Sequence, residues 1–348
     1  MKMHPLLVDP EAVAVILQPV PDAPAWPDFA RSACVALEAL QVVLSGEKVV
    51  LKPNVTSGEH FHNPENGIGT HPAFIGGMVD YLRGHGARAG GIYVVEDPRD
   101  SDDNHPRHWQ GTGYLEMAAQ TGAKLRCPTA FTCVRKPVPH PLVHASRNVS
   151  RPAVAADTVL INVPKLKTHN LAITTLCMKN LMGLDNVFDR HYCAQAIKEL
   201  PPEWQITDRP HKDWMTSDVH ELWQFGLARR LVDLAQVLKP HLNVVEGIVG
   251  RDGTGFNRGS NRTLGIVVAG INVVAVDSIA SYLMGHDPRE LIYLKLAASA
   301  GLGQNDPARL RVYVADTRDG GAAELAPCHD LAALRCDPPF KVLRDIKE

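Results

Sequence analysis

Three side chains that can bind anions or carry protons stand at alternate positions in the segment 164–169, which reads P-K-L-K-T-H. Lysines shielded from water bind carboxylate or phosphate groups, or act as bases when their pKa is lowered. Histidine exchanges a proton near neutral pH. The segment follows an apolar run at 158–163, which favours a functional cluster over a solvated basic turn. We therefore predict catalytic roles for Lys165 and His169 and substrate binding by Lys167.

Residues that follow strands are the next candidates, because ligands of open parallel sheets bind beyond the carboxyl ends of the strands. Lys52 and Asn54 follow the apolar run at 48–51, and Glu96 follows the run at 91–95. The segment 179–183, K-N-L-M-G, lies on the helix candidate that comes next, where a lysine either reaches the surface or points into the same crevice. The predicted substrate-binding residues are Lys52, Asn54, Lys167, Lys179, Asn180, Glu96 and Glu246, and the predicted catalytic residues are His169, Lys165 and His191.

A cluster of this composition suits chemistry in which negative charge develops on the substrate, because cations stabilise that charge in the transition state. His169 or His191 would move the proton, and His169 is preferred because it follows a buried strand directly. Asn54 or Asn180 would donate a hydrogen bond to the developing oxyanion. Glu96 and Glu246 would orient the lysines or act as the complementary base.

Metal and nucleotide sites are not indicated by the sequence. The histidines at 60, 62, 71, 105 and 108 lack carboxylates or thiols at ligand spacing and are predicted to be scattered on the surface. Segment 253–255, G-T-G, lacks the spacing of a phosphate-binding loop. Segment 67–72, G-I-G-T-H-P, predicts a loop that ends in an N-cap at Thr70. The cofactor therefore stays unknown, with a metal possible but not indicated.

Composition places the chain among ordinary globular proteins. Its 348 residues are 45% hydrophobic and 21% charged, which excludes a disordered tail, collagen or a coiled coil. The formal net charge of −2 gives no global electrostatic argument for binding nucleic acid or a membrane. The 7 cysteines form no C-x-x-C pair, so we predict reduced thiols and no cluster motif. A cytoplasmic location is expected, since residues 1–10 do not resemble a secretory signal.

The elements that must position these residues alternate between short apolar runs and segments of helical period. This alternation predicts an α/β fold with a mostly parallel β-sheet flanked by helices on both faces. The strand candidates are 12–17, 48–51, 91–95, 158–163, 243–249, 264–269 and 311–314, and the helix candidates are 28–43, 72–85, 114–121, 174–182, 219–238, 275–284 and 288–300. The length allows one unit over 1–348 or two lobes, 1–150 and 151–348, with the site in the crevice between them.

The sequence resembles the DUF362 family, an uncharacterised α/β family, over roughly residues 45–305. The resemblance is carried by K-P-N at 52–54, T-H-P at 70–72, P-K-L-K-T-H at 164–169, K-N-L-M-G at 179–183 and A-V-D at 275–277. It implies that the Lys, Asn and His segments meet in one pocket. Many relatives carry a ferredoxin-like module with four-cysteine motifs, which this chain lacks. The chain also differs at Glu246, where an aspartate is usual, and at Phe256, where a proline is common.

Two functions are compatible with this pattern. The first is an isomerase, epimerase or lyase that acts by proton transfer on a small metabolite bearing a carboxylate or phosphate. The second is a non-catalytic or redox-accessory protein that binds an anionic ligand, a metal or an externally supplied cluster. The expected partners are a small anionic substrate and, in the second case, an electron-transfer protein, whereas neither nucleic acid nor a membrane is expected.

Overall fold

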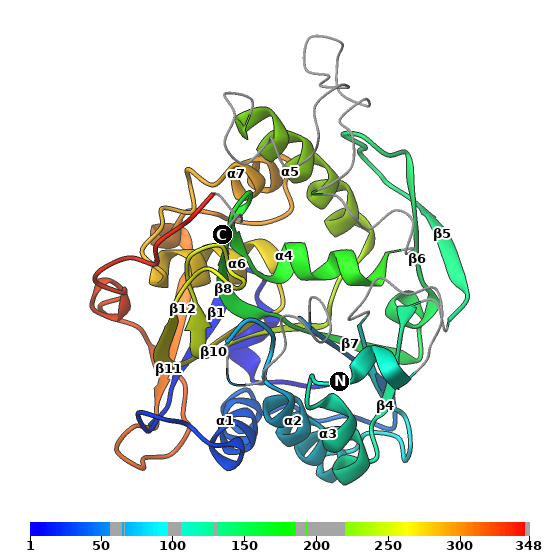
Figure 1. Ribbon diagram of the computed structural model, residues 1–348, viewed down its shortest axis with the longest axis vertical. Coiled ribbons are helices and arrows are strands. Elements are labelled where there is room, and N and C mark those ends of the chain that lie inside the picture. Colours follow the sequence, from blue (N-terminus) through cyan, green and yellow to red (C-terminus); the bar gives the residue numbers. More distant parts are fainter. Residues whose placement is uncertain are drawn as a thin grey trace.

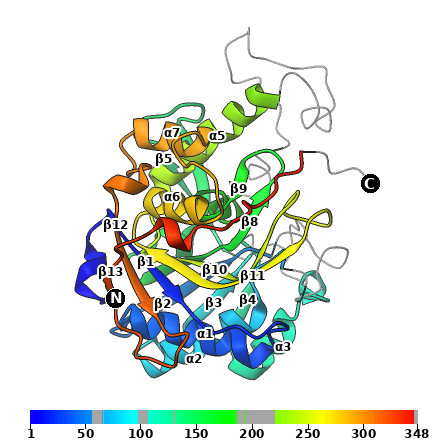
Figure 2. The ribbon, with the colours of Figure 1, turned by 90° about the vertical axis from the view of Figure 1, so that its left-hand side faces the viewer.

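Three layers make up the part of the chain that the computed structural model describes, which comprises residues 1–55, 65, 67–96, 106–128, 131–185, 193 and 220–344. A mixed, largely parallel sheet of eleven strands forms the middle layer. Helices α1, α2 and α3 cover one face of this sheet, and α4 to α7 cover the other (Figures 1 and 2). The predicted α/β fold with helices on both faces is therefore confirmed.

The helices within the described residues are α1 (Trp26–Ala39), α2 (Pro72–Gly84), α3 (Tyr114–Thr121), α4 (Cys177–Asn180), α5 (His220–Val237), α6 (Val273–Leu283) and α7 (Ile292–Ser299). The strands are β1 (Ala12–Leu17), β2 (Lys48–Pro53), β3 (Ile92–Val95), β4 (Lys124–Arg126), β5 (Cys133–Pro137), β6 (Ser146–Ser150), β7 (Thr158–Val163), β8 (Lys165–His169), β9 (Ile173–Thr175), β10 (Leu242–Arg251), β11 (Asn261–Gly270), β12 (Arg311–Asp316) and β13 (Ala326–Pro327). Strands β5 and β6 form a separate hairpin.

The strands of the main sheet follow the order β13-β12-β1-β11-β10-β7-β2-β3-β4. The sheet therefore contains strands from before and after residue 150. Only β11 and β13 run against the direction shared by the other strands on this path. The carboxyl ends of β2, β3, β7 and β10 therefore meet at the same edge, where α/β proteins place their ligands.

Alternate residues of the central strands belong to two separate apolar cores. Val49 and Leu51 of β2 belong to the core beneath α1, α2 and α3, whereas Val50 packs in the core beneath α4 to α7. This is the pleat of a strand whose two faces are both covered, and it explains why the strands lack polar residues at alternate positions.

Pro164 separates β7 from β8, and both strands lie side by side with the long strand β10. Strand β7 pairs with the beginning of β10, through Asn162 opposite Asn243, and β8 pairs with its later part, through Lys165 opposite Glu246. Proline has no amide hydrogen for the ladder, which suits a break between two strand segments. The P-K-L-K-T-H segment therefore lies on a strand that extends the carboxyl edge of the sheet.

Several predicted boundaries are wrong near the site. The helix predicted over 174–182 begins only at Cys177, because Thr174 and Thr175 pair with β8 as part of β9. The strand candidate 243–249 is confirmed and extended to β10, which holds Glu246 in its middle. The segment 165–169, which no strand candidate covered, is the strand β8, because it pairs with β10 and with β9. Strand pairing thus outweighed the local pattern.

Candidate functional site

Lys165, Lys167 and His169 share one face of β8, because side chains two residues apart in a strand point the same way. They are only 1%, 2% and 4% exposed, respectively. Leu166 points to the opposite face and joins the core beneath α4 to α7. The spacing of the P-K-L-K-T-H segment thus places three polar side chains together in a buried environment, where each requires a partner.

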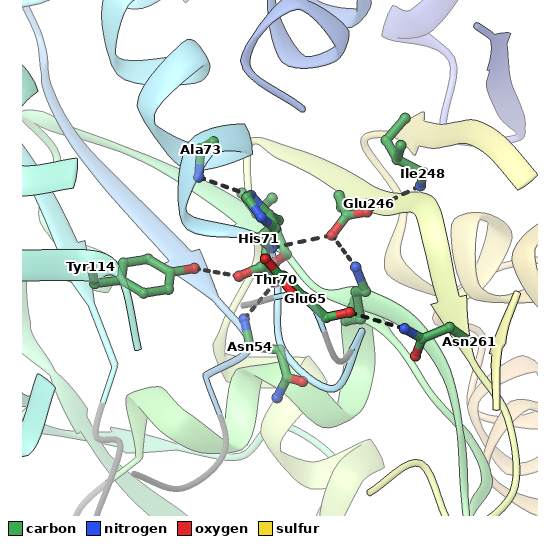
Figure 3. Close-up of polar contacts among 11 residues, drawn as sticks. Asn54, Glu65, Thr70, His71, Ala73, Tyr114, Glu246, Ile248 and Asn261 are labelled. Atoms are coloured by element: carbon green, nitrogen blue, oxygen red, sulfur yellow. Dashed lines mark hydrogen bonds and ion pairs between the residues drawn. The ribbon is translucent and has the colours of Figure 1, made fainter. Parts of the chain in front are cut away.

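Lys165 has a carboxylate partner supplied by the chain. Its Nζ lies 2.5 Å from Oε2 of Glu246, and both side chains are buried. Oε2 of Glu246 also accepts a hydrogen bond from the backbone N–H of His71 (3.2 Å), and Oε1 accepts one from Ile248 (3.0 Å) (Figure 3). Burial lowers the pKa of Lys165, and the Glu246 charge opposes that shift. The Glu246 carboxylate is thereby held by one ammonium group and two backbone amides.

The T-H-P segment fixes the start of α2, from which Glu246 receives the His71 amide. The N-cap is His71 rather than the predicted Thr70, since His71 Nδ1 accepts a hydrogen bond from Ala73 N (3.1 Å). His71 is buried, contrary to the surface position predicted for it, and stacks on Phe29 with ring centroids 3.8 Å apart. Burial and the Lys165 charge lower the pKa of His71 to about 3, so the imidazole is neutral.

Thr70 connects three neighbouring segments instead of capping the helix. Its Oγ1 accepts a hydrogen bond from Asn54 N (3.0 Å) and donates one to Val163 O (2.7 Å). Its carbonyl accepts a hydrogen bond from the hydroxyl of Tyr114 (2.9 Å). In Figure 3 the side chain of Asn54 points away from Thr70 and Glu246. The Asn54 residue therefore contributes its backbone to this region of the site.

Lys52 forms the second buried ion pair, with Glu96. Its Nζ also donates hydrogen bonds to Pro53 O (2.7 Å) and to Oδ1 of Asn180 (3.2 Å). A Cβ atom on Gly183 would lie 2.5 Å from both Lys52 Cε and Glu96 Oε2. The glycine of the K-N-L-M-G segment therefore leaves room for this ion pair.

A chain of hydrogen-bonded asparagine side chains connects Lys52 to the centre of the sheet. Nδ2 of Asn180 donates hydrogen bonds to Lys52 O and to Oδ1 of Asn162, both at 2.8 Å. Nδ2 of Asn162 continues the chain to Oδ1 of Asn243 at 3.0 Å. Both N–H groups of the Asn180 amide thus donate to groups of the protein. This favours a positioning role for Asn180 over the predicted contact with an oxyanion.

Asp277 of α6 places α4, the short helix that carries Lys179 and Asn180. Its carboxylate accepts hydrogen bonds from Cys177 N (2.7 Å) and Met178 N (3.0 Å). Burial raises the pKa of Asp277 to about 7 despite these bonds, which act in the opposite direction. The A-V-D segment of the sequence therefore caps the helix that presents Lys179.

Lys167 and Lys179 form the cationic part of the site. Burial, followed by the charges of Lys179, Lys165 and Arg251, lowers the pKa of Lys167 well below its usual range, whereas Glu96 opposes the shift. Lys179 is half-buried and makes no ion pair with any residue in the part of the chain described here. Most of the described charges that act on Lys167 are therefore positive.

His169 is held by the turn that joins β8 to β9. Its Nδ1 accepts hydrogen bonds from Leu171 N (3.0 Å) and Ala172 N (3.1 Å). Burial, together with the charges of Lys179 and Lys167, lowers its pKa well below the usual range. Two amide donors at Nδ1 require the neutral tautomer with its proton on Nε2, so Nε2 is a hydrogen-bond donor. Proton transfer by His169 stays a prediction. Because Nδ1 already accepts two hydrogen bonds, Nε2 is the ring nitrogen that would face a ligand.

The structure brings together most of the residues predicted from the sequence. Lys52, Glu96, Lys165, Lys167, His169, Lys179, Asn180 and Glu246 converge at the carboxyl edge of the sheet. His191, and the histidines at 60, 62 and 105, lie outside the described residues. Sequence reasoning missed Asn162, Asn243 and Arg251, although the buried asparagines within two apolar runs were a visible signal.

The described ranges hold neither a metal-ligand group nor a membrane-spanning helix. There, no group of three or more His, Cys, Asp or Glu side chains could hold a metal ion. In the same ranges, no helix is both long and apolar enough to cross a bilayer. The seven cysteines are free thiols.

The fold and the site define an α/β protein with two buried lysine–glutamate pairs and two further lysines, Lys167 and Lys179, at the carboxyl edge of its sheet. The chain belongs to the family described as Domain of unknown function (DUF362), which matches residues 49–282. It is 25% identical over 266 residues to the thylakoid-associated protein sll1697 of Synechocystis sp., an alignment that covers 76% of this chain and 71% of that protein. No solved structure matches the chain.

Proposed function

We propose that this protein is an enzyme that binds a small metabolite bearing a carboxylate or phosphate and moves a proton on it, as an isomerase, epimerase or lyase does. The observation that carries the proposal is the half-buried ammonium group of Lys179, which has no carboxylate partner among the described residues and whose charge lowers the pKa of both Lys167 and His169. Lys165, by contrast, contacts the carboxylate of Glu246. An anionic ligand would supply Lys179 with a counter-charge.

Lys179 is the proposed anchor for the anionic group of the substrate. Its side chain is half-buried, so a ligand can reach it from solvent, and it has no carboxylate partner among the described residues. An ammonium group in partly desolvated surroundings binds a carboxylate or phosphate oxygen more strongly than it does in water. The same charge would stabilise an enolate formed next to the bound carboxylate.

Lys167 is the proposed general base and His169 the proposed hydrogen-bond donor to the developing oxyanion. Burial and neighbouring cations lower the pKa of Lys167 well below its usual range, which is the direction that suits an amine acting as a base. In the proposed step the Cα–H bond of the substrate breaks and the proton passes to Lys167 Nζ. The electron pair moves onto the carboxylate, where Nε2–H of His169 and Lys179 stabilise it. Return of the proton to either face completes isomerisation, and loss of a β-substituent completes elimination.

The two ion pairs would then position the reacting groups. The Lys165–Glu246 pair fixes the first residue of β8, and the Lys52–Glu96 pair fixes Asn180 next to Lys179. Because a catalytic group must be held to within a fraction of an ångström, such rigid neighbours are an advantage. Lys52, Lys165, Glu96 and Glu246 therefore act as positioning residues in this proposal.

Exchange of substrate protons with solvent tests the enzymatic proposal. Lactate, malate and 3-phosphoglycerate would each be incubated with the protein in D₂O, and loss of the proton signal next to the carboxylate would be followed by NMR. Exchange is expected for at least one compound, and Lys167→Met should slow it by about 10²- to 10⁴-fold. Lys295→Met, at an exposed position of α7, is the matched control. Equal rates in Lys167→Met and the control would overturn the assignment of the base.

A second candidate function is binding of an anion without catalysis, alone or as a redox-accessory protein with an electron-transfer partner. The fully used amide of Asn180 and the blocked Nδ1 of His169 favour it, because fewer groups remain for proton transfer. Tight binding of a carboxylate without any exchange of its protons would support this candidate over the enzyme.

A cytoplasmic location remains part of the proposal. The name of the Synechocystis relative associates that protein with the thylakoid. Fractionation of cells followed by detection of the native protein distinguishes the two possibilities. Recovery with the soluble fraction supports the proposal, and recovery with membranes that resists a salt wash contradicts it.

A further inference from the structure

The aromatic ring of Phe256 lies beside the reacting groups of the proposed mechanism. Lys167 Nζ lies 4.7 Å from the centroid of this ring. The imidazole of His169 meets the same ring edge-on, with centroids 6.0 Å apart and an interplanar angle of 68°. Phe256 itself is half-buried. One aromatic side chain therefore lies beside both the proposed base and the proposed hydrogen-bond donor, and part of its surface is accessible to solvent.

The loop that carries Phe256 is fixed against β8. Arg251 Nε donates a hydrogen bond to Phe256 O (2.9 Å), and Phe256 N donates one to Oγ1 of Thr254 (3.3 Å). Gly255 has a φ of +76°, and a Cβ atom there would lie 2.0 Å from Thr168 O. Gly255 thus allows close approach to the backbone of β8, and the ring is held beside Lys167 and His169.

An aromatic wall at this place discriminates between anions. A phosphate group carries several strongly hydrated oxygens, and each oxygen turned toward an apolar ring loses water without gaining a donor. A carboxylate attached to an apolar body can turn its oxygens to Lys179 and lay that body against the ring. Offset or edge-on contact between flat apolar groups adds to the area that is buried.

Building on the function proposed above, we propose that Phe256 determines specificity and that the site takes a carboxylate whose Cα–H carbon bears an apolar, flat group, such as an arylacetate or a β,γ-unsaturated carboxylate. Phe256 would contact the apolar body of the substrate, and Lys179 its carboxylate. Substrates whose only anionic group is a phosphate would be disfavoured, which narrows the class left open by charge alone.

Calorimetric titration with three probes tests this inference: phenylacetate, acetate and inorganic phosphate. We expect the unaltered protein to bind phenylacetate about tenfold more tightly than acetate, and phosphate most weakly. In Phe256→Ala the preference for phenylacetate should fall to about twofold or less, with acetate affinity changed much less than phenylacetate affinity. Phe256→Leu keeps an apolar side chain without the flat ring and should fall between the two. Thermal melting checks that both variants are folded.

The outcomes separate this inference from the function on which it rests. Tighter binding of phosphate than of either carboxylate, or an unchanged preference in both variants, overturns the role of Phe256 while the anion site stands. If Phe256→Ala does not fold, the result with Phe256→Leu decides. Failure of all three probes to bind, with no difference between the unaltered protein and Lys179→Met, overturns the anion site and this inference together.

Discussion

Lys165 and Lys167 lie two residues apart on the same face of β8, yet the protein treats their charges differently. Lys165 contacts the carboxylate of Glu246, which opposes the effect of burial on its pKa. Lys167 is surrounded mainly by other cations, which add to the effect of burial. We call the two ion pairs the paired half of the site (Lys52, Glu96, Lys165, Glu246). The cationic half consists of the remaining cations and the hydrogen-bond donor His169 (Lys167, His169, Lys179, Arg251).

The difference between the halves shows how buried lysines can serve structure or function. A buried charge whose partner comes from the chain is satisfied before any ligand arrives, and removal of that partner leaves an uncompensated charge. A buried charge whose described neighbours are mostly of the same sign remains unfavourable until a ligand supplies a counter-charge or the group loses its proton. Substitutions in the paired half should therefore affect stability first, and substitutions in the cationic half should affect ligand binding first.

The largest effect is expected for Glu246→Gln, which removes the counter-charge of Lys165 but keeps the side-chain shape. The free energy of unfolding should fall by about 3–5 kcal/mol, as for other broken buried ion pairs. Urea denaturation measures it. The double variant Lys165→Met with Glu246→Leu should recover most of the loss, because both charges are then absent. A loss of less than about 1 kcal/mol in Glu246→Gln would show that Lys165 is not held as an ion pair.

Lys179→Met should have the opposite signature. Acetate affinity should fall by about 10- to 100-fold, corresponding to the roughly 1.5–3 kcal/mol of a charged hydrogen bond. The melting temperature should stay nearly constant, since Lys179 is half-buried and has no ion pair with the described residues. Isothermal titration and thermal melting give both quantities, with Lys295→Met as the control. Lost stability with unchanged acetate affinity would place Lys179 in the paired half instead.

A smaller effect is expected for Gly183→Ala, which adds one methyl group against the Lys52–Glu96 pair. The new Cβ would lie 2.5 Å from Lys52 Cε and Glu96 Oε2, so one of the two side chains must move. A loss of about 1–3 kcal/mol in unfolding free energy follows from overpacking of this kind. Gly84→Ala at the end of α2 is the matched control, because a Cβ there has no neighbour within 4 Å. Equal stability of the two variants would mean that the ion pair can shift freely.

Per pH unit, the smallest effects are the changes of stability with pH, and the two helix caps should give opposite signs. His71, beside the paired half, has a pKa of about 3 against an ordinary value of 6.5, so the folded protein binds fewer protons. Its contribution is complete above pH 6.5 and is lost as pH falls toward 3. Asp277, which caps the helix of Lys179, has a pKa of about 7 against 3.8. Its contribution is complete below pH 3.8 and is lost as pH rises through 7.

Urea denaturation at several pH values between 4 and 7 separates these two contributions. The stability of the unaltered protein minus that of His71→Asn should increase with pH over this window. The same difference for Asp277→Asn should decrease, with a slope of at most about 1.4 kcal/mol per pH unit for either residue. If both differences changed in the same direction with pH, one of the two protonation assignments would be wrong.

The sequence was sufficient to predict the layers of the fold and the side chains that gather at the sheet edge. Apolar runs such as 12–17 and 158–163 match β1 and β7 at both ends, because a strand buried on both faces is apolar along nearly its whole length and the run ends where the strand ends. The alternate spacing of Lys165, Lys167 and His169 implies a shared face wherever the segment is extended. These features follow from local chain geometry, which a sequence carries directly.

Only the tertiary structure decided which lysine receives a carboxylate and which tautomer His169 adopts. Glu246 reaches Lys165 from 81 residues away, because β8 and β10 pair beyond the break at Pro164. The His169 proton is placed by two amides of a turn that exists only when β9 returns along β8. Residues of the same type at equal spacing thus acquired different partners, because electrostatic energy depends on distances in space that strand pairing and burial set.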